Sequence, residues 1–207
     1  MTTVGRWSPN KVRARVLDGT WVSTEELGGM VLLTPTSIAY TGTSATVGAN
    51  GSVDFTACSS LSLNGVFSAD YDNYVIATRI DQSTLSAWRF RMRSSGTDED
   101  SVSNYYTTQY LYATSTSVSA GRNTGNLSTF GWIGPTVKAG YTANFYGPFL
   151  AQPTAIRTFG VSNESSATIV DYAWTHSLST SYDGITMLND AAYTANGLVS
   201  VYGIRGA

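Results

Sequence analysis

The sequence is short of the residues that build disulfides, metal centres and charged surfaces. It holds one cysteine and one histidine in 207 residues, and only 13% of its residues are charged. Cys58 alone cannot form an intrachain disulfide, so the fold does not rest on a disulfide framework. A zinc site of the usual type needs several histidine or cysteine ligands, which Cys58 and His176 do not supply. We therefore expect neither a metal nor another cofactor.

Charge and hydropathy exclude two further classes of partner. A net charge of −2 favours neither nucleic acid nor an anionic membrane surface. No stretch approaches the ~18 apolar residues that a membrane helix needs. The opening stretch MTTVGRWSPNKVRARV lacks the apolar core of a secretory signal. We expect no nucleic-acid binding, no membrane insertion and no Sec-type export.

Residues suited to catalysis are also few. A serine hydrolase would have to use His176, which stands in YAWTHSLST with no nucleophile elbow beside it. The acidic cluster at 97–100 lacks the spacing of a calcium loop, and no glycine-rich phosphate loop occurs. Carboxylate pairs of the glycosidase kind would have to come from aspartates that turn capping explains better: Asp70, Asp72, Asp171 and Asp183. The sequence predicts no enzyme and no catalytic residues.

The sequence is rich in short strand patterns. Residues 52–57 alternate apolar and polar side chains, and in 87–93 the side chains of Trp88, Phe90 and Met92 share one face. Further strands are expected at 72–80, 104–113, 127–134, 141–150, 154–161, 168–176, 184–189 and 198–204. Turn residues separate most of these segments, and none has a convincing helical period. We predict an all-β, antiparallel, jelly-roll-like β-sandwich over residues 36–207.

The first 35 residues differ from the remainder in charge. Four of the twelve basic residues precede Asp18, the first acid. A flexible tail is one interpretation, but two tryptophans are unusual in a segment that stays in water. We therefore predict that residues 1–35 form an extended attachment arm that orders against a partner. The arm residues expected to make that contact are Arg6, Trp7, Lys11, Arg13, Arg15 and Trp21.

One short phrase occurs twice, as SADYDNYVIATRI at 68–80 and STSYDGITMLND at 179–190. In each phrase a Tyr-Asp pair precedes a turn-forming residue and an apolar run. An aspartate before a strand can cap the preceding turn through its side chain, while the tyrosine covers the end of the sandwich and keeps its hydroxyl in water. We interpret the repeat as a fold device rather than a pair of catalytic sites.

Several phrases in order resemble a jelly-roll domain of tailed-bacteriophage minor tail and fibre proteins. They are VDFTACSSLSLNGVFSADYDNYVIATRI, WRFRMRSSGTDEDSVSNYY, YGPFL, SYDGITML and VSVYGIRG. The likeness covers about residues 52–205 and leaves the N-terminal arm uncovered. It implies a virion structural protein without catalytic residues, a homotrimer, that assembles in the host cytoplasm and therefore needs no export signal.

Two groups of side chains are candidates for contact with a neighbouring subunit or a glycan. One is the aromatic surplus, and the other is the arginine row of the strand at 87–93. Their members are Tyr105, Tyr106, Tyr110, Trp132, Arg89, Arg91 and Arg93. Tyrosine, tryptophan and arginine are enriched in subunit interfaces, whereas flat rings also stack on sugars. We favour subunit contact for the aromatics. The arginine row is either a solvated face or a row that meets the acidic loop 98–100 of a neighbour.

The leading hypothesis is thus a minor tail, tail-tip or short fibre component that contacts other virion proteins. Recognition of host-surface glycans is a further hypothesis that belongs to the tail position. A capsid decoration protein is the alternative, since the arm has neither heptads nor a shaft repeat. A free carbohydrate-binding module is the second alternative, and it would require an exposed aromatic platform with a dispensable N-terminus.

Overall fold

The computed structural model describes residues 29–101, 105–114, 116–123, 127–162, 168–189 and 191–204. The chain divides into two compact units, of which Met30–Gly206 is the one described below. The six arm residues predicted to bind a partner lie outside the described residues. The strands are β1 (Met30–Leu33), β2 (Ser37–Val47), β3 (Val53–Asn64), β4 (Asn73–Ser94), β5 (Thr97–Asp98), β6 (Tyr105–Ala113), β7 (Val118–Asn123), β8 (Phe130–Tyr146), β9 (Thr154–Ser162), β10 (Thr168–His176), β11 (Gly184–Asn189) and β12 (Ala195–Ile204).

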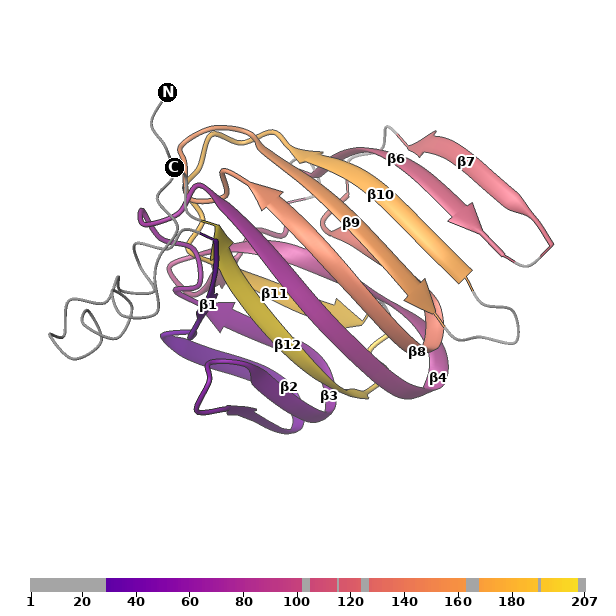
Figure 1. Ribbon diagram of the computed structural model, residues 1–207, viewed down its shortest axis with the longest axis horizontal. Helices are drawn as coiled ribbons and strands as arrows, with labels where there is room; N and C mark the ends of the chain where they lie inside the picture. Colours follow the sequence, from indigo (N-terminus) through magenta and orange to yellow (C-terminus); the bar gives the residue numbers. More distant parts are fainter. Residues whose placement is uncertain are drawn as a thin grey trace, which may run out of the picture. The chain divides into compact units, whose positions relative to one another are not determined.

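All strand pairs of the described residues are antiparallel, and no described residue is helical. The strand order is β1-β12-β3-β11-β4-β8-β9-β10-β6-β7, with β2 beside β3 and β5 beside β4. Figure 1 shows β12, β4, β8, β9 and β10 running side by side. The predicted all-β, antiparallel fold is confirmed. β1 belongs to this sheet although its residues fall in the segment predicted as the arm.

Two predicted strand pairs are single long strands. Residues 72–80 and 87–93 both belong to β4, while 127–134 and 141–150 contribute to β8. The pairing of β4 with β8 changes register between Asp81 and Phe90, and such irregularities let one strand bend from one layer of a sandwich into the other. The sequence alone does not distinguish this bend from a turn, because Gln82, Ser83 and Thr84 are polar there.

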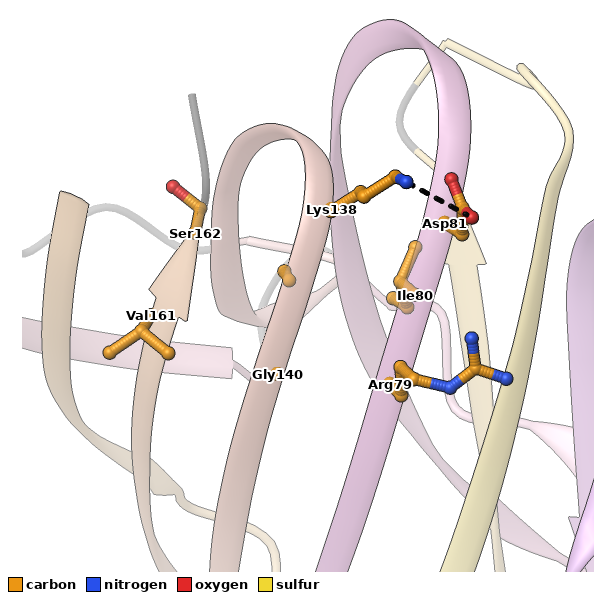
Figure 2. Close-up of a pocket in the computed structure, with 8 residues that line it drawn as sticks. Arg79, Ile80, Asp81, Lys138, Gly140, Val161 and Ser162 are labelled. Carbon is orange, nitrogen blue, oxygen red and sulfur yellow. Dashed lines mark ion pairs between the residues drawn. The ribbon is translucent and has the colours of Figure 1, made fainter. Parts of the chain in front are cut away.

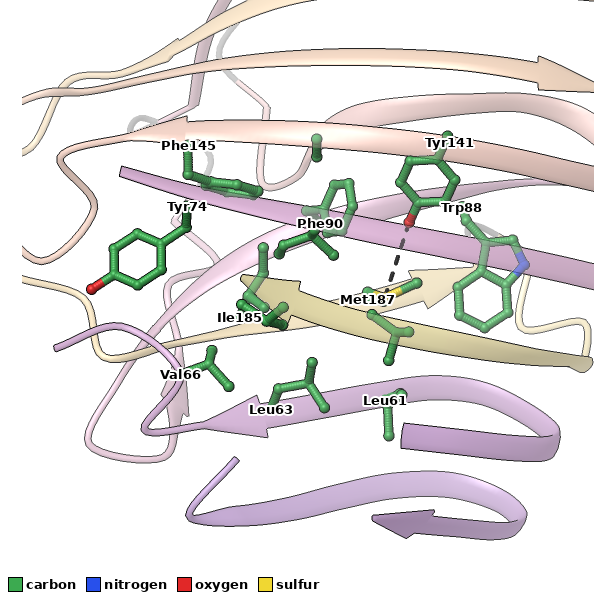
Figure 3. Packing of buried hydrophobic residues seen from close by; sticks show 14 of the residues in the cluster. Leu61, Leu63, Val66, Tyr74, Trp88, Phe90, Tyr141, Phe145, Ile185 and Met187 are labelled. Atoms are coloured by element: carbon green, nitrogen blue, oxygen red, sulfur yellow. Dashed lines mark hydrogen bonds between the residues drawn. The ribbon is translucent and has the colours of Figure 1, made fainter. Parts of the chain in front are cut away.

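The core lies between the layers and is built from the apolar faces of these strands. Trp88, Phe90 and Met92 are all fully buried, as the alternation at 87–93 predicts. Figure 3 shows Phe90 between Phe145 and Met187, with Leu61 and Leu63 of β3 below them. Each large side chain buried in this way stabilises the fold by roughly 1.5–3 kcal/mol.

The two Tyr-Asp phrases meet at one turn. The carbonyl of Asp72 accepts a hydrogen bond from the Gly147 amide at 2.8 Å, and the Tyr182 amide donates to the Pro148 carbonyl at 2.9 Å. The phrases are therefore a fold device: together they hold the chain between β8 and β9.

Their side chains depart from the prediction in two ways. The Tyr182 hydroxyl lies 3.4 Å from Nε2 of His176 in the interior rather than in water. The Asp183 carboxylate accepts from the Ser95 amide at 3.1 and 3.2 Å, so it caps the distant β4–β5 hairpin rather than its own turn. That hairpin needs the cap, since Ser95 and Gly96 both have positive φ, as a type I′ turn requires.

Candidate binding surface

The arginine row of β4 is not the uniform surface that the alternation suggested. Arg93 is only 7% exposed. It donates to Asn64 Oδ1 at 2.9 Å, to Thr186 Oγ1 at 2.8 Å and to Ser62 Oγ at 3.1 Å, and it pairs with Asp98. This residue is therefore buried within its own subunit.

The acidic partner of the row also comes from the same chain. The β4–β5 hairpin folds Asp98 back against Arg93, and the Asp98 carboxylate lies 3.9 Å from Arg91 as well. Arg91 further donates to the Ser128 carbonyl at 3.1 Å, and Arg89 is half-buried. Arg91 and Arg93 therefore meet Asp98 of their own subunit, while contact of Arg89 with a neighbour stays a prediction.

Of the predicted aromatic contacts, Tyr110 is the one whose side chain the structure describes. Its ring is half-buried and stacks on Tyr172 with centroids 5.6 Å apart, and Tyr172 stacks in turn on Trp174 at 5.7 Å. Gly121 of β7 leaves room for the Tyr110 ring, since a Cβ there would lie 2.6 Å from its hydroxyl. Tyr105 and Tyr106 belong to β6 and Trp132 to β8, with side chains outside the described set.

The opposite face of the same strands is a surface that the sequence analysis did not identify. Residues directly opposite each other in antiparallel strands point to the same side of the sheet. One such row is Gly140, Val161, Ile169, Ala113 and Val118. The next row is Thr142, Phe159, Asp171, Leu111 and Ala120. We define the open face as the outward residues of β6, β9 and β10 in these rows and beside them: Leu111, Ala113, Ala155, Arg157, Phe159, Val161, Ile169, Asp171, Ala173 and Thr175.

Large apolar side chains of the open face are about half exposed to solvent. Phe159 is 48% exposed, Val161 50%, Ile169 45% and Leu111 42%. Single exposed apolar residues are ordinary, but a contiguous group of this kind marks an interaction surface. Val118 of the edge strand β7 extends the group and is 69% exposed.

An ion pair lies in the middle of this apolar group. The Arg157 guanidinium donates two hydrogen bonds to the Asp171 carboxylate, from Nε at 3.0 Å and from Nη2 at 2.6 Å. These hydrogen bonds and the carboxylate charge raise the pKa of Arg157. Asp171 stands directly between Phe159 and Leu111 in its row. Among the described side chains of β6, β9 and β10 that form the open face, these two are the charged ones, and they neutralise each other.

A shallow groove borders the open face where β4 and β8 bend. It has a volume of about 580 Å³ and lies above Gly140, where the missing side chain leaves a hollow. Figure 2 shows Val161 on one side of the groove and, across Gly140, the Arg79 side chain together with Lys138 paired to Asp81, whose charged atoms are 3.9 Å apart. The open face thus passes from an apolar centre to a charged border.

The single histidine lies in the interior. His176 has no exposed surface, and its ring meets Tyr182 edge-on with centroids 5.1 Å apart. Burial lowers the pKa of His176 to about 4, although the negative charge of Glu99 acts in the opposite direction. The residues that the structure describes include no group of three or more His, Cys, Asp or Glu that could hold a metal ion. They also include no helix long and apolar enough to span a membrane. The described geometry thus offers a contact surface, the open face.

The signal for the open face is weak in any one strand. In TAIRTFGV the buried positions are Thr154, Ile156, Thr158 and Gly160, while Phe159 and Val161 fall on the other side. The outward face of this strand therefore carries large apolar side chains, which is unusual for an antiparallel sheet with one face in water. Strand β10 repeats the feature, with Val170 inside and Ile169 outside. Large apolar residues at the outward positions of two adjacent strands are the pattern that could have predicted the surface.

No protein-family model and no curated protein matches the chain. Two solved structures show a weak likeness. One is a protein of unknown function from Shewanella oneidensis MR-1, 10% identical, with 98% of this chain and 97% of that chain covered and a TM-score of 0.25. The other is domain 4 of an extracellular arabinanase from Geobacillus stearothermophilus, solved in complex with arabinotriose, 12% identical, with 87% and 84% covered and a TM-score of 0.22. Likeness at this level assigns neither a family nor a function.

Proposed function

We propose that the chain is a structural subunit of a bacteriophage particle, attached through its N-terminal arm and displaying the β-sandwich on the particle surface. The minor tail, tail tip or short fibre is the favoured position. The phrases that resemble phage tail domains support this proposal. The all-β, antiparallel fold agrees with it.

The open face is the observation that carries the proposal. Leu111, Phe159, Val161 and Ile169 present a contiguous apolar surface around a neutralised ion pair. Exposed apolar patches of this kind mark interaction sites, and a subunit of an assembly buries such a face against a neighbour. In an oligomer or a larger tail assembly the surface would be covered.

The test is to locate the protein on intact phage particles by gold-labelled antibody. The proposal expects label at the tail. Deleting residues 1–28, which ends before β1, should leave a folded domain that no longer joins particles. Incorporation of the truncated chain at the level of the full chain would overturn the arm assignment, and the absence of label from every particle would overturn the virion assignment.

The same labelling separates the two placements. A capsid decoration protein is the second candidate, supported by an N-terminal segment without heptads or shaft repeats. It expects label spread over the head. A glycan array on the full chain tests host-surface recognition, which belongs to the tail placement and to the free carbohydrate-binding module. Glycan binding by a protein that no particle contains would favour the module.

A further inference from the structure

We infer that the open face binds the open face of a second copy of this chain, so that two subunits pair face to face about a two-fold axis. This inference rests on the proposed use of that face as a subunit contact, and it names the partner. Three features of the open face support it: its charge, its area and its shape.

The charge of the open face suits a copy of itself. Arg157 and Asp171 already satisfy each other through two hydrogen bonds at 3.0 and 2.6 Å. Burying β6, β9 and β10 therefore leaves neither of these two charges unpaired, which is the usual penalty for desolvating an ion, while the exposed Arg122 of the edge strand β7 stands at the margin of the surface in the Arg157 row. A strongly acidic or basic partner would gain nothing from it. When the two-fold axis passes near this ion pair, each Arg157 guanidinium also faces the Asp171 carboxylate of the other copy.

The area equals that of a functional surface patch and is modest for an interface. Strands lie about 4.8 Å apart and rise about 3.4 Å per residue, so five strands from β8 to β7 and the span from Ala155 to Val161 cover roughly 20 by 20 Å. That is about 400 Å² in projection, the size of the largest patch on a typical monomer, which is often functional. It is about half of the ~800 Å² per partner in a standard interface. A contact of this size predicts a reversible dimer, which the high local concentration on a particle would favour.

The shape of the open face permits close packing of two sheets. Small residues stand beside the large ones, with Ala155 and Ala173 flanking Arg157 and Gly140 opposite Val161. Two sheets pack about 10 Å apart when the side chains of their facing sides interdigitate. Phe159, at the centre and 48% exposed, is then the residue that loses most contact with water.

The test is sedimentation of the full chain across the micromolar range. We expect a monomer–dimer equilibrium, and Phe159→Glu should raise its dissociation constant by about 30-fold or more. Tyr193→Glu is the matched control, because Tyr193 is an aromatic residue with 47% exposure that lies off the open face. It should leave the equilibrium unchanged. Thermal unfolding of both variants checks that they are folded. If Phe159→Glu does not fold, Phe159→Ser takes its place.

A cross-linking experiment locates the contact. Cys58 is fully buried, so disulfide formation between copies reports the introduced surface cysteine and not the native one. Ala173→Cys should form disulfide-linked dimers under mild oxidation, while Ala191→Cys, in an exposed loop, should not. A chain that stays monomeric at every concentration overturns the inference. So does a trimer, whether Phe159→Glu leaves it intact or dissociates it, because a three-fold contact is not face to face. Particle labelling is independent of this result, so the virion proposal can survive its failure.

Discussion

Two arginine–aspartate pairs of this protein have the same chemistry and opposite surroundings. Arg93 and Asp98 lie beneath the β4–β5 hairpin, where Arg93 is 7% exposed and also donates to Asn64, Ser62 and Thr186. Arg157 and Asp171 stand in the open, on the open face, where Arg157 is solvated. The buried pair is complete within one subunit. The exposed pair is satisfied in charge but surrounded by apolar side chains that still contact water.

The difference shows how a charge can serve the fold or serve assembly. A buried pair costs solvation and is retained when a network satisfies every donor. An exposed pair contributes little to stability, because water competes for both ions. We infer that the first pair fixes the end of the sandwich and that the second makes an apolar face soluble before it meets a partner.

The largest effect is expected from breaking the buried pair. Arg93→Leu removes the donor of a network that includes Asp98 and Thr186 and leaves the carboxylate without its main partner. We expect the free energy of unfolding to fall by about 3–5 kcal/mol. Urea denaturation followed by tryptophan fluorescence measures it.

Arg79→Leu is the control for this change, since Arg79 is an exposed arginine on the same strand. It should alter stability by no more than about 0.5 kcal/mol. Equal effects of the two substitutions would show that the network does not hold the hairpin.

The pH dependence of stability probes a second buried group, His176. His176 is uncharged in the folded protein until the pH falls to its pKa of about 4, against an ordinary value of 6.5. Between these values the unfolded chain binds the proton and the folded chain does not, so stability is lost as the pH falls from about 6.5 to 4. The loss attributable to His176 is on the order of 3 kcal/mol.

Measuring urea midpoints from pH 7 to pH 4 in the wild type and in His176→Gln separates this contribution from that of the carboxylates. The variant should lose less stability over that range than the wild type. If the urea midpoints of the two proteins fell equally with pH, His176 would be protonated in the folded protein as readily as in water, which contradicts the burial argument.

The sequence predicted the parts of the fold that depend on local pattern. Trp88, Phe90 and Met92 alternate with arginines and are all buried, because period-2 alternation reports a half-buried strand directly. For Arg93 the alternation predicted either a solvated face or a contact with a neighbour, and the side chain is buried instead. Its burial depends on the β4–β5 hairpin bringing Asp98 back over the strand, and a contact made by a turn is not visible in alternation.

The open face could not be predicted from the pattern of single strands, for a related reason. Phe159 and Ile169 look like core residues in their own strands, and each strand also carries inward apolar residues that fill the core. Register decides which residues share a face, and register depends on pairing between β6, β9 and β10. The aromatic surplus that drew attention instead includes Tyr110, which stacks half-buried on Tyr172.

The smallest effect on a single subunit is expected at the exposed pair. Arg157→Ala should leave the urea midpoint of dilute, monomeric protein close to that of the wild type, because Arg157 is solvated and its bonds to Asp171 are replaced by bonds to water. The same substitution should weaken association at high concentration, since the Asp171 carboxylate would then be buried in the contact without its partner. Asp171→Asn, combined with Arg157→Ala, should restore part of that association by removing the stranded charge. A stability loss as large as that of Arg93→Leu would mean that the pair is already desolvated within one subunit, and the contrast between the two pairs would be wrong.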